Sequence, residues 1–363
     1  MNRARRAALT ASRMAHAVAV TAALTTCLVA GMATSAAAVT QPRQPAYGPG
    51  SKNYVHRDWR VHSGGTGNDA FYVFEPVKPR PRRAPLAIVM HGYYAFSGYA
   101  NLYELIRHTV RKGSVVIYPR WQTSATSPCP GPHNIEPCLA SAVNGIRGGL
   151  KYLRTGKDRV KPRLARTSYF GFSFGGIITA NLANRYKSLH LPRPRAMFLD
   201  DPHDGGLTGT DEPALDDDLS GIPPTTLIQC HSGADGVLSD PAGAGNPSNP
   251  AAPKQGASCN SVFPRLKTVP ANNKDLILTH TDEHGTPALS SDHGVCTAPK
   301  GDADAYDWNF CWRVWDALRT CAYFRVHCRY ALGDTPRHRF NGRWSAGVPI
   351  APLTIQDAAP IAP

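Results

Sequence analysis

The sequence has 363 residues, of which 42% are hydrophobic and 18% are charged, and it contains 32 glycines and 32 prolines. The apolar fraction is sufficient for a large core and excludes intrinsic disorder. The low charge and the many turn-forming residues exclude a coiled coil or a helical array. The formal net charge is +14, but the basic residues are scattered among prolines without a basic helix or an interleaved aromatic platform. Nucleic acid is therefore not expected as a partner.

The first 38 residues have the pattern of a secretory signal peptide. Four arginines among residues 1–13 precede a mostly apolar run over 14–32, and a small-residue cleavage site ends at Ala38. We therefore predict a secreted, extracellular monomer without a stable membrane anchor. Beyond the leader we expect a flexible linker over 39–54, one main domain over 55–330, and a C-terminal extension over 331–363 that packs on the domain or trails it.

The number of cysteines is consistent with a secreted protein. Cys27 lies in the leader, and the other eight form an even set that suits an oxidising compartment. No paired C-x-x-C spacing is present, so a cysteine zinc site is not expected and we predict no metal. Proximity along the chain favours four local disulfides, namely Cys129–Cys138, Cys230–Cys259, Cys296–Cys311 and Cys321–Cys328.

Strands and helices alternate along the chain. A hairpin is predicted from 55–61 and 70–76, and the wholly apolar run 86–90 suits a strand that is buried on both faces. Further strands are predicted at 115–118, 168–172, 196–199, 225–230 and 276–279, and helices at 102–110, 139–154, 176–186 and 307–323. This alternation predicts an α/β fold with a mainly parallel central sheet, helices on both faces and no large cap domain.

One motif in the middle of this series carries chemistry. The sequence Gly171-Phe172-Ser173-Phe174-Gly175 is a G-x-S-x-G turn, and it lies between a predicted buried strand and an apolar helix. A serine hydroxyl is a poor nucleophile unless it is held clear of the backbone beside a base, and this turn holds it in that way. Ser173 is therefore the predicted nucleophile.

In this context the sequence resembles the α/β-hydrolase superfamily, from about residue 55 to residue 323. His91-Gly92-Tyr93 follows the third strand, where that superfamily places its oxyanion loop. The resemblance implies an oxyanion hole formed by the backbone N–H groups of Tyr93 and Phe174, and it implies no cofactor. Within the superfamily, the sequence is similar to secreted polyester hydrolases, cutinase-like lipases and small bacterial esterases.

The resemblance also implies a carboxylate and a histidine in that order after the serine. Asp235 follows the strand predicted at 225–230 and resembles the family's acid, with Asp200 and Asp201 in reserve. For the base, His284 lies a few residues beyond the last predicted strand and precedes a glycine. His293 is second, since a longer loop could return it to Ser173.

We predict hydrolysis of short-chain, aromatic or polymeric esters. The segment 200–224 is rich in Asp, Gly and Pro and cannot form an amphipathic lid helix, so an open site is expected. The side chains predicted to line the cleft are His91, Tyr93, Tyr94, Phe96 and Trp121.

Other functions remain open from the sequence. The superfamily also contains lipases, acyltransferases and peptidases, and a fold cannot choose among them. His280, Glu283 and His284 fit the H-x-x-E-H zinc motif, although the strand pattern before it and Pro287 after it oppose a helix. A non-catalytic protein that binds cell-surface polymer is a third possibility.

Overall fold

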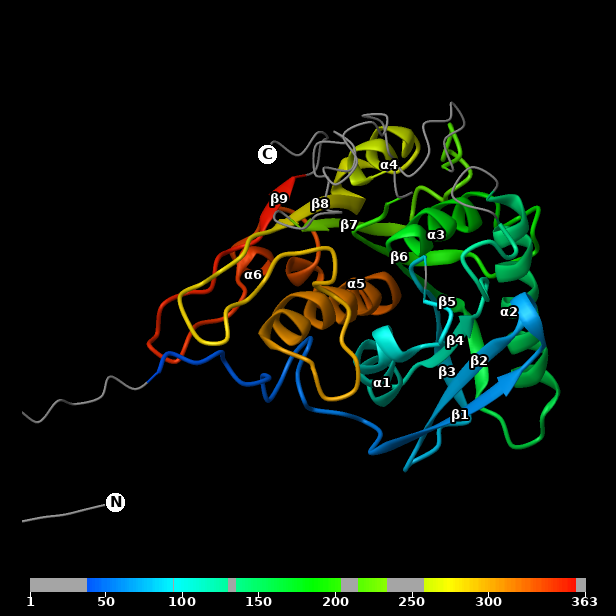
Figure 1. Ribbon diagram of the computed structural model, residues 1–363, viewed down its shortest axis with the longest axis horizontal. Coiled ribbons are helices and arrows are strands. Elements are labelled where there is room, and N and C mark those ends of the chain that lie inside the picture. The colour runs from blue at the N-terminus through cyan, green and yellow to red at the C-terminus, as the bar shows by residue number, and fades with distance from the viewer. Residues whose placement is uncertain (1–37, 94, 130–134, 204–214, 234–257, 357–363) are drawn as a thin grey trace, which may run out of the picture. The chain divides into compact units, whose positions relative to one another are not determined.

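A computed structural model describes residues 38–93, 95–129, 135–203, 215–233 and 258–356. Within these ranges, one mixed nine-stranded sheet runs in the order β1-β2-β4-β3-β5-β6-β7-β8-β9 (Figure 1). The strands are β1 (Asp58–Gly64), β2 (Phe71–Val77), β3 (Arg83–Met90), β4 (Val115–Pro119), β5 (Lys161–Phe172), β6 (Pro194–Asp200), β7 (Leu227–Gly233), β8 (Lys274–Thr279) and β9 (Thr354–Gln356).

The direction of pairing changes across the sheet. The neighbouring pairs from β4 through β3, β5, β6 and β7 to β8 are parallel. At the edges, β1 pairs with β2, β2 with β4, and β8 with β9 in antiparallel fashion. The prediction of a mainly parallel sheet therefore holds for the centre and not for the edges. Because the central strands are parallel, the loops that follow β3, β5, β6 and β8 all leave from the same end of the sheet.

Helices cover both faces of this sheet (Figure 1). Alternate side chains of β3 point to opposite sides, so that Leu86 and Ile88 enter one apolar cluster while Ala87 and Val89 enter the other. The first cluster includes side chains of α2, α3 and α4, and the second includes those of α1 and α5. The helices are α1 (Tyr103–Arg111), α2 (Glu136–Thr155), α3 (Phe174–Asn184), α4 (Cys259–Arg265), α5 (Trp312–Phe324) and α6 (Pro336–Arg339).

Both ends of the described chain pack on this unit, which extends from residue 38 onward. The predicted linker 39–54 is bound to the domain, since the Gly50 N–H donates to Asp316 Oδ2 at 3.0 Å and the Ala305 N–H donates to Gln41 Oε1 at 3.1 Å. Within the C-terminal extension, Trp344 is buried and β9 adds to the sheet. The expectation of a flexible linker therefore differs from the structure, because a backbone N–H and a polar side chain of this segment find partners on the domain.

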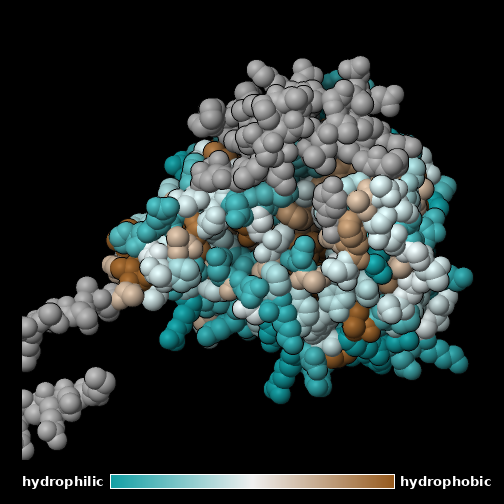
Figure 2. Space-filling model, viewed as in Figure 1, coloured by the Kyte–Doolittle hydropathy of each residue, from teal (hydrophilic) through white to brown (hydrophobic). Residues whose placement is uncertain are grey.

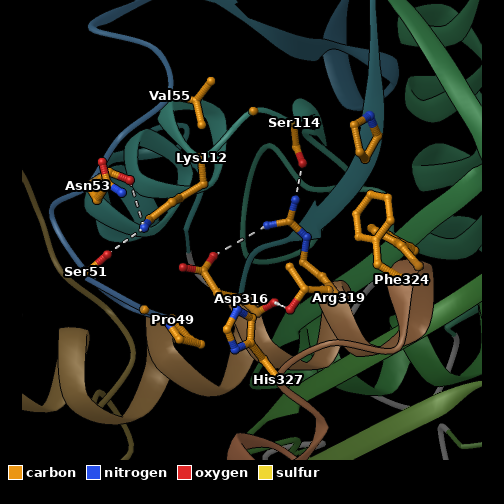
Figure 3. A pocket seen from close by; sticks show the side chains of 15 residues that line it. Pro49, Ser51, Asn53, Val55, Lys112, Ser114, Asp316, Arg319, Phe324 and His327 are labelled. Carbon is orange, nitrogen blue, oxygen red and sulfur yellow. Dashed lines mark hydrogen bonds and ion pairs between the residues drawn. The ribbon is translucent and has the colours of Figure 1, made fainter.

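A pocket of about 320 Å³ lies where this N-terminal segment meets α5 (Figure 3). Lys112 Nζ donates to Ser51 Oγ at 2.9 Å and to the Asn53 carbonyl at 3.1 Å. Arg319 donates to Ser114 and forms an ion pair with Asp316 at 3.9 Å. The charged side chains that line the pocket thus bind the protein itself, and they join the N-terminal segment to α1 and α5.

The eight cysteines pair as predicted, as Cys129–Cys138, Cys230–Cys259, Cys296–Cys311 and Cys321–Cys328. Disulfides are typical of proteins in oxidising compartments. Among the described residues, no helix is long and apolar enough to cross a membrane. On the part of the face in Figure 2 that is not drawn in grey, hydrophilic side chains are frequent and hydrophobic ones form small separate groups. The predicted signal peptide lies outside the described residues.

Candidate active site

Ser173 occupies a strained turn between β5 and α3. Its backbone has φ 55° and ψ −129°, in the left-handed half of conformational space that residues with a side chain rarely adopt. Such strain costs about 1 to 3 kcal/mol and persists only where the surroundings enforce it. Here the Ser173 N–H donates to the Asp200 carbonyl at 2.9 Å, and the Gly176 N–H donates to the Ser173 carbonyl at 2.7 Å. The side chain is thereby held at the start of the helix and is partly exposed.

Glycines make this turn possible. A Cβ on Gly171 would collide with the Gly175 carbonyl oxygen, and a Cβ on Gly175 would collide with the carbonyl oxygen of His91. The second collision shows that the loop after β3 lies directly against the serine turn. The G-x-S-x-G spacing is therefore required by close backbone packing at this point.

His293 lies against Ser173. Its Nε2 is 2.9 Å from Ser173 Oγ, and its Nδ1 is 2.8 Å from Asp201 Oδ2. The ring packs on Phe172, with centroids 4.9 Å apart, and the side chain is 16% exposed. Hydroxyl, imidazole and carboxylate thus form a continuous chain of hydrogen bonds that begins at a partly exposed serine. Arrangements of this kind can activate a serine.

The electrostatic surroundings favour a proton on His293. Burial lowers the pKa of the imidazole, but the hydrogen bond and charge of Asp201 and the charges of Asp200 and Asp292 outweigh burial, so the pKa is raised. The raised pKa means that these carboxylates stabilise the protonated form of the ring. The nearby Asp201 side chain is only 3% exposed, which keeps its interaction with the ring poorly screened.

His284, the first choice for the base, lies elsewhere. A short bridge between Asp282 and Leu289 turns the chain outward after β8 and brings it back before His293. His284 lies on the outward excursion, where it is exposed and its ring centroid is 6.2 Å from that of Trp344. Asp282 stabilises this part of the loop, because its Oδ1 accepts a hydrogen bond from the His284 N–H at 2.9 Å. The longer-loop alternative, with His293 at the serine, is the one that the structure supports.

Asp235, the first choice for the acid, lies outside the described residues. The carboxylate that contacts His293 belongs to Asp201, a reserve choice, which directly follows β6. Asp201 has φ 42°, and its N–H donates to the His231 carbonyl on β7 at 2.8 Å. This turn directs the carboxylate toward the histidine loop. The other reserve residue, Asp200, is buried and binds His231 instead.

The predicted oxyanion residues flank the serine. The rings of Tyr93 and Phe174 meet edge to face with centroids 5.4 Å apart, and a Cβ on Gly92 would lie 3.1 Å from the Ser173 Cβ. Tyr93 Oη donates to the Ala125 carbonyl at 2.6 Å. This contact ties the loop after β3 to the segment that carries the Cys129–Cys138 disulfide.

The predicted cleft side chains divide into two groups. His91 and Trp121 are 1% and 0% exposed and stack with ring centroids 4.5 Å apart, so they support the loop from beneath and do not line a cleft. Burial lowers the pKa of His91 to about 4, although its hydrogen bond to Gly92 opposes this, and the ring is neutral at pH 7. Tyr93 and Phe96 are partly exposed, and Tyr94 lies outside the described residues.

The zinc motif is not on a helix. Residues 280–284 form an irregular segment, and His280 Nε2 lies 2.8 Å from Thr354 Oγ1. In the described part of the chain, the metal-compatible grouping is Asp200, His231 and Cys296. Cys296 is bonded to Cys311 and has no thiolate to offer. The donor set therefore does not suit zinc.

Comparisons with known proteins place this geometry in context. No family model matches the sequence, and no curated protein matches it. Among solved structures, a thermostable esterase from Pseudomonas putida is similar over 39% of this chain and 42% of that chain, with 20% identity and a TM-score of 0.31. The chain thus matches less than half the length of that esterase.

Proposed function

We propose that this chain is a secreted serine hydrolase of the α/β-hydrolase type that cleaves carboxylic esters through Ser173, His293 and Asp201. The observation that carries the proposal is the pair of hydrogen bonds at His293, 2.9 Å to Ser173 Oγ and 2.8 Å to Asp201 Oδ2, at a strained strand-to-helix turn. The order of serine, acid and histidine along the chain is the order that this superfamily uses.

The proposed reaction proceeds through an acyl-enzyme. His293 Nε2 takes the Ser173 proton as Oγ attacks the ester carbonyl, and Asp201 holds the ring in the tautomer whose Nδ1–H faces the carboxylate. The imidazolium then returns the proton to the leaving alcohol. Water repeats the sequence, giving its proton to His293 and releasing the acid with a free Ser173.

The oxyanion of each tetrahedral intermediate needs donors beside Ser173. Phe174 begins α3, where backbone N–H groups have no partner within the helix, and Tyr93 lies across from it on the loop after β3. We assign the oxyanion hole to these two backbone N–H groups, each of which contributes about 3 to 4 kcal/mol to the transition state in such sites.

The fold assignment rests on the centre of the sheet. Ser173, Asp201 and His293 come from loops after β5, β6 and β8, and these strands belong to the parallel part of the sheet. Binding sites in such sheets form at the carboxyl ends of the strands. Secretion rests on the leader pattern over 1–38 and on the four disulfides.

The substrate class follows from what surrounds the serine. Ser173 is partly exposed, and the partly exposed rings of Tyr93 and Phe96 belong to the loop beside it. Aromatic walls favour acyl or aromatic groups, and an open site would admit a polymer chain. The segment 204–214, part of the region predicted to lack a lid, lies outside the described residues, so the open site remains a prediction.

The test compares wild type with Ser173→Ala on p-nitrophenyl esters of rising chain length, a peptide amide and a polyester film. We expect wild type to hydrolyse p-nitrophenyl butyrate below its solubility limit, and Ser173→Ala to lose this activity while its thermal unfolding stays unchanged. Activity of Ser173→Ala within a few-fold of wild type would overturn the serine mechanism. A rate that rises only when an emulsion forms would replace the esterase assignment with a lipase.

A further inference from the structure

A second chain of hydrogen bonds lies beside the proposed triad. His231 Nδ1 is 2.8 Å from Asp200 Oδ1, and His231 Nε2 is 2.9 Å from Thr279 Oγ1. Thr279 Oγ1 is in turn 2.6 Å from Ser291 Oγ. All four side chains are fully buried. The set therefore repeats the order carboxylate, imidazole, hydroxyl, but no substrate can reach its hydroxyl.

This buried series of hydrogen bonds is connected to the proposed triad at both ends. At one end, Asp200 precedes Asp201, and the Asp201 N–H donates to the His231 carbonyl at 2.8 Å. At the other end, Ser291 lies two residues before His293. Asp200, His231 and Thr279 therefore join the turn that carries the acid to the loop that carries the base, across the ends of β6, β7 and β8.

One assignment of protons gives each of these three hydrogen bonds a donor and an acceptor. Ser291 O–H donates to Thr279 Oγ1, Thr279 O–H donates to His231 Nε2, and His231 Nδ1–H donates to Asp200 Oδ1. In this arrangement each hydroxyl donates once, and the His231 ring donates at Nδ1 and accepts at Nε2. Removing the Thr279 hydroxyl leaves both His231 Nε2 and Ser291 Oγ without this partner inside the core, where lost hydrogen bonds are costly.

We propose that Asp200, His231 and Thr279 are positioning residues that hold Asp201 and His293 in line with Ser173. The inference rests on the proposed ester hydrolase function. The buried hydrogen-bonded side chains do not themselves react. It fixes the spacing between the acid turn and the base loop, and the Cys296–Cys311 disulfide anchors the same loop three residues beyond His293.

The test uses one substitution at two matched buried threonines. Thr279 and Thr226 are both 0% exposed, and Thr226 Oγ1 donates to the Pro194 carbonyl at 3.0 Å at the opposite end of β6. Thr279→Val should lower kcat by about 10- to 100-fold with little change in KM, since small displacements of catalytic groups have effects of this size. Thr226→Val should lower the unfolding temperature similarly and leave kcat near wild type.

Rescue and a second variant separate positioning from loss of structure. Thr279→Ser keeps a hydroxyl and should restore most of kcat. Ser291→Ala removes the outer donor and should reduce kcat in the same direction by a smaller factor, which gives a readout even if Thr279→Val fails to fold. Equal kcat in Thr279→Val, Thr226→Val and wild type would overturn the positioning role alone.

Labelling by a fluorophosphonate distinguishes this failure from failure of the proposed function. Rapid labelling of wild-type Ser173 with equally rapid labelling of Thr279→Val and Ser291→Ala would leave the hydrolase and remove the positioning role. No labelling of wild type would overturn the proposed function and the positioning role with it. We expect rapid labelling of wild type, slower labelling of Thr279→Val and recovery in Thr279→Ser.

Discussion

Two sets of carboxylate, imidazole and hydroxyl lie side by side at one end of the sheet, and they differ in access. Ser173 sits at a strained turn and is partly exposed, whereas Thr279 lies within β8 and is fully buried. The hydrogen-bond lengths at the two histidines are nearly the same, 2.8 and 2.9 Å in both. Three residue types in hydrogen-bonding order are therefore not enough for the catalysis proposed at Ser173. The backbone must also present the hydroxyl to a substrate.

The imidazole rings differ in the same way. His231 is 0% exposed and its carbonyl supports the acid turn, while His293 is 16% exposed and packs on Phe172. Burial raises the pKa of Asp200, against the hydrogen bond and charge of His231. We therefore assign a structural task to the buried set and a chemical task to the exposed one.

The largest effect is expected from removing the exposed imidazole. His293→Ala should lower kcat by about 10⁴- to 10⁶-fold, as losses of a triad histidine do. His284→Ala is the matched control, because His284 is exposed and its ring lies beside Trp344. Steady-state kinetics should show near-normal activity for this control. The opposite ranking would return the base to His284.

The next largest difference in kcat is expected between variants of the two neighbouring aspartates, Asp200 and Asp201. Asp201→Asn should lower kcat by about 10⁴-fold, because an amide beside His293 Nδ1 favours the wrong tautomer. Asp200→Asn changes the same functional group one residue away and should cost far less. Comparable losses in both variants, measured at equal stability, would contradict the division between chemical and positioning roles.

A smaller effect is expected in the pH profile. The raised pKa of His293 means that the neutral base is lost as pH falls through a value above about 6.5, so the acid limb of kcat/KM should lie above that pH. Asp200→Asn removes one of the charges that raise this pKa and should move the limb to lower pH. Besides each other, Asp200 and His293 interact electrostatically with Asp201, His231, Asp292 and Asp307. A limb that stays in place would show that Asp200 is uncharged or too distant to act.

The smallest effect is expected from chelation. Asp200 and His231 bind each other, and Cys296 is held in a disulfide, so EDTA should leave ester hydrolysis unchanged. Loss of activity that zinc restores would assign a metal to this grouping or to His280 and His284.

The sequence indicates the fold well where strands are long and apolar. The side chains of runs 86–90 and 168–172 alternate between the two apolar clusters, and the second run leads into the glycine turn at Ser173. The apolar run and the glycine motif are both visible in a few consecutive residues. The edge strand β9 has three residues and pairs only because the C-terminal segment returns to β8, which no local pattern encodes. Local sequence likewise does not indicate that segment 39–54 is bound, because its partners are distant along the chain.

The site was predictable in part. Ser173 follows from its motif, but the choice between His284 and His293 depends on the bridge from Asp282 to Leu289, a contact within an irregular loop. The acid depends on a left-handed residue after β6 and on one hydrogen bond to β7. The pair Asp200-Asp201 ends a predicted strand, and this position is the sequence signal that makes both residues candidates for the acid.

Activation of Ser173 by His293 and Asp201 can be measured by mass spectrometry after fluorophosphonate labelling. We expect one adduct on wild type, located on Ser173, with labelling abolished in Ser173→Ala and strongly slowed in His293→Ala but not in His284→Ala. An unlabelled wild-type protein, or an adduct on another residue, would contradict it.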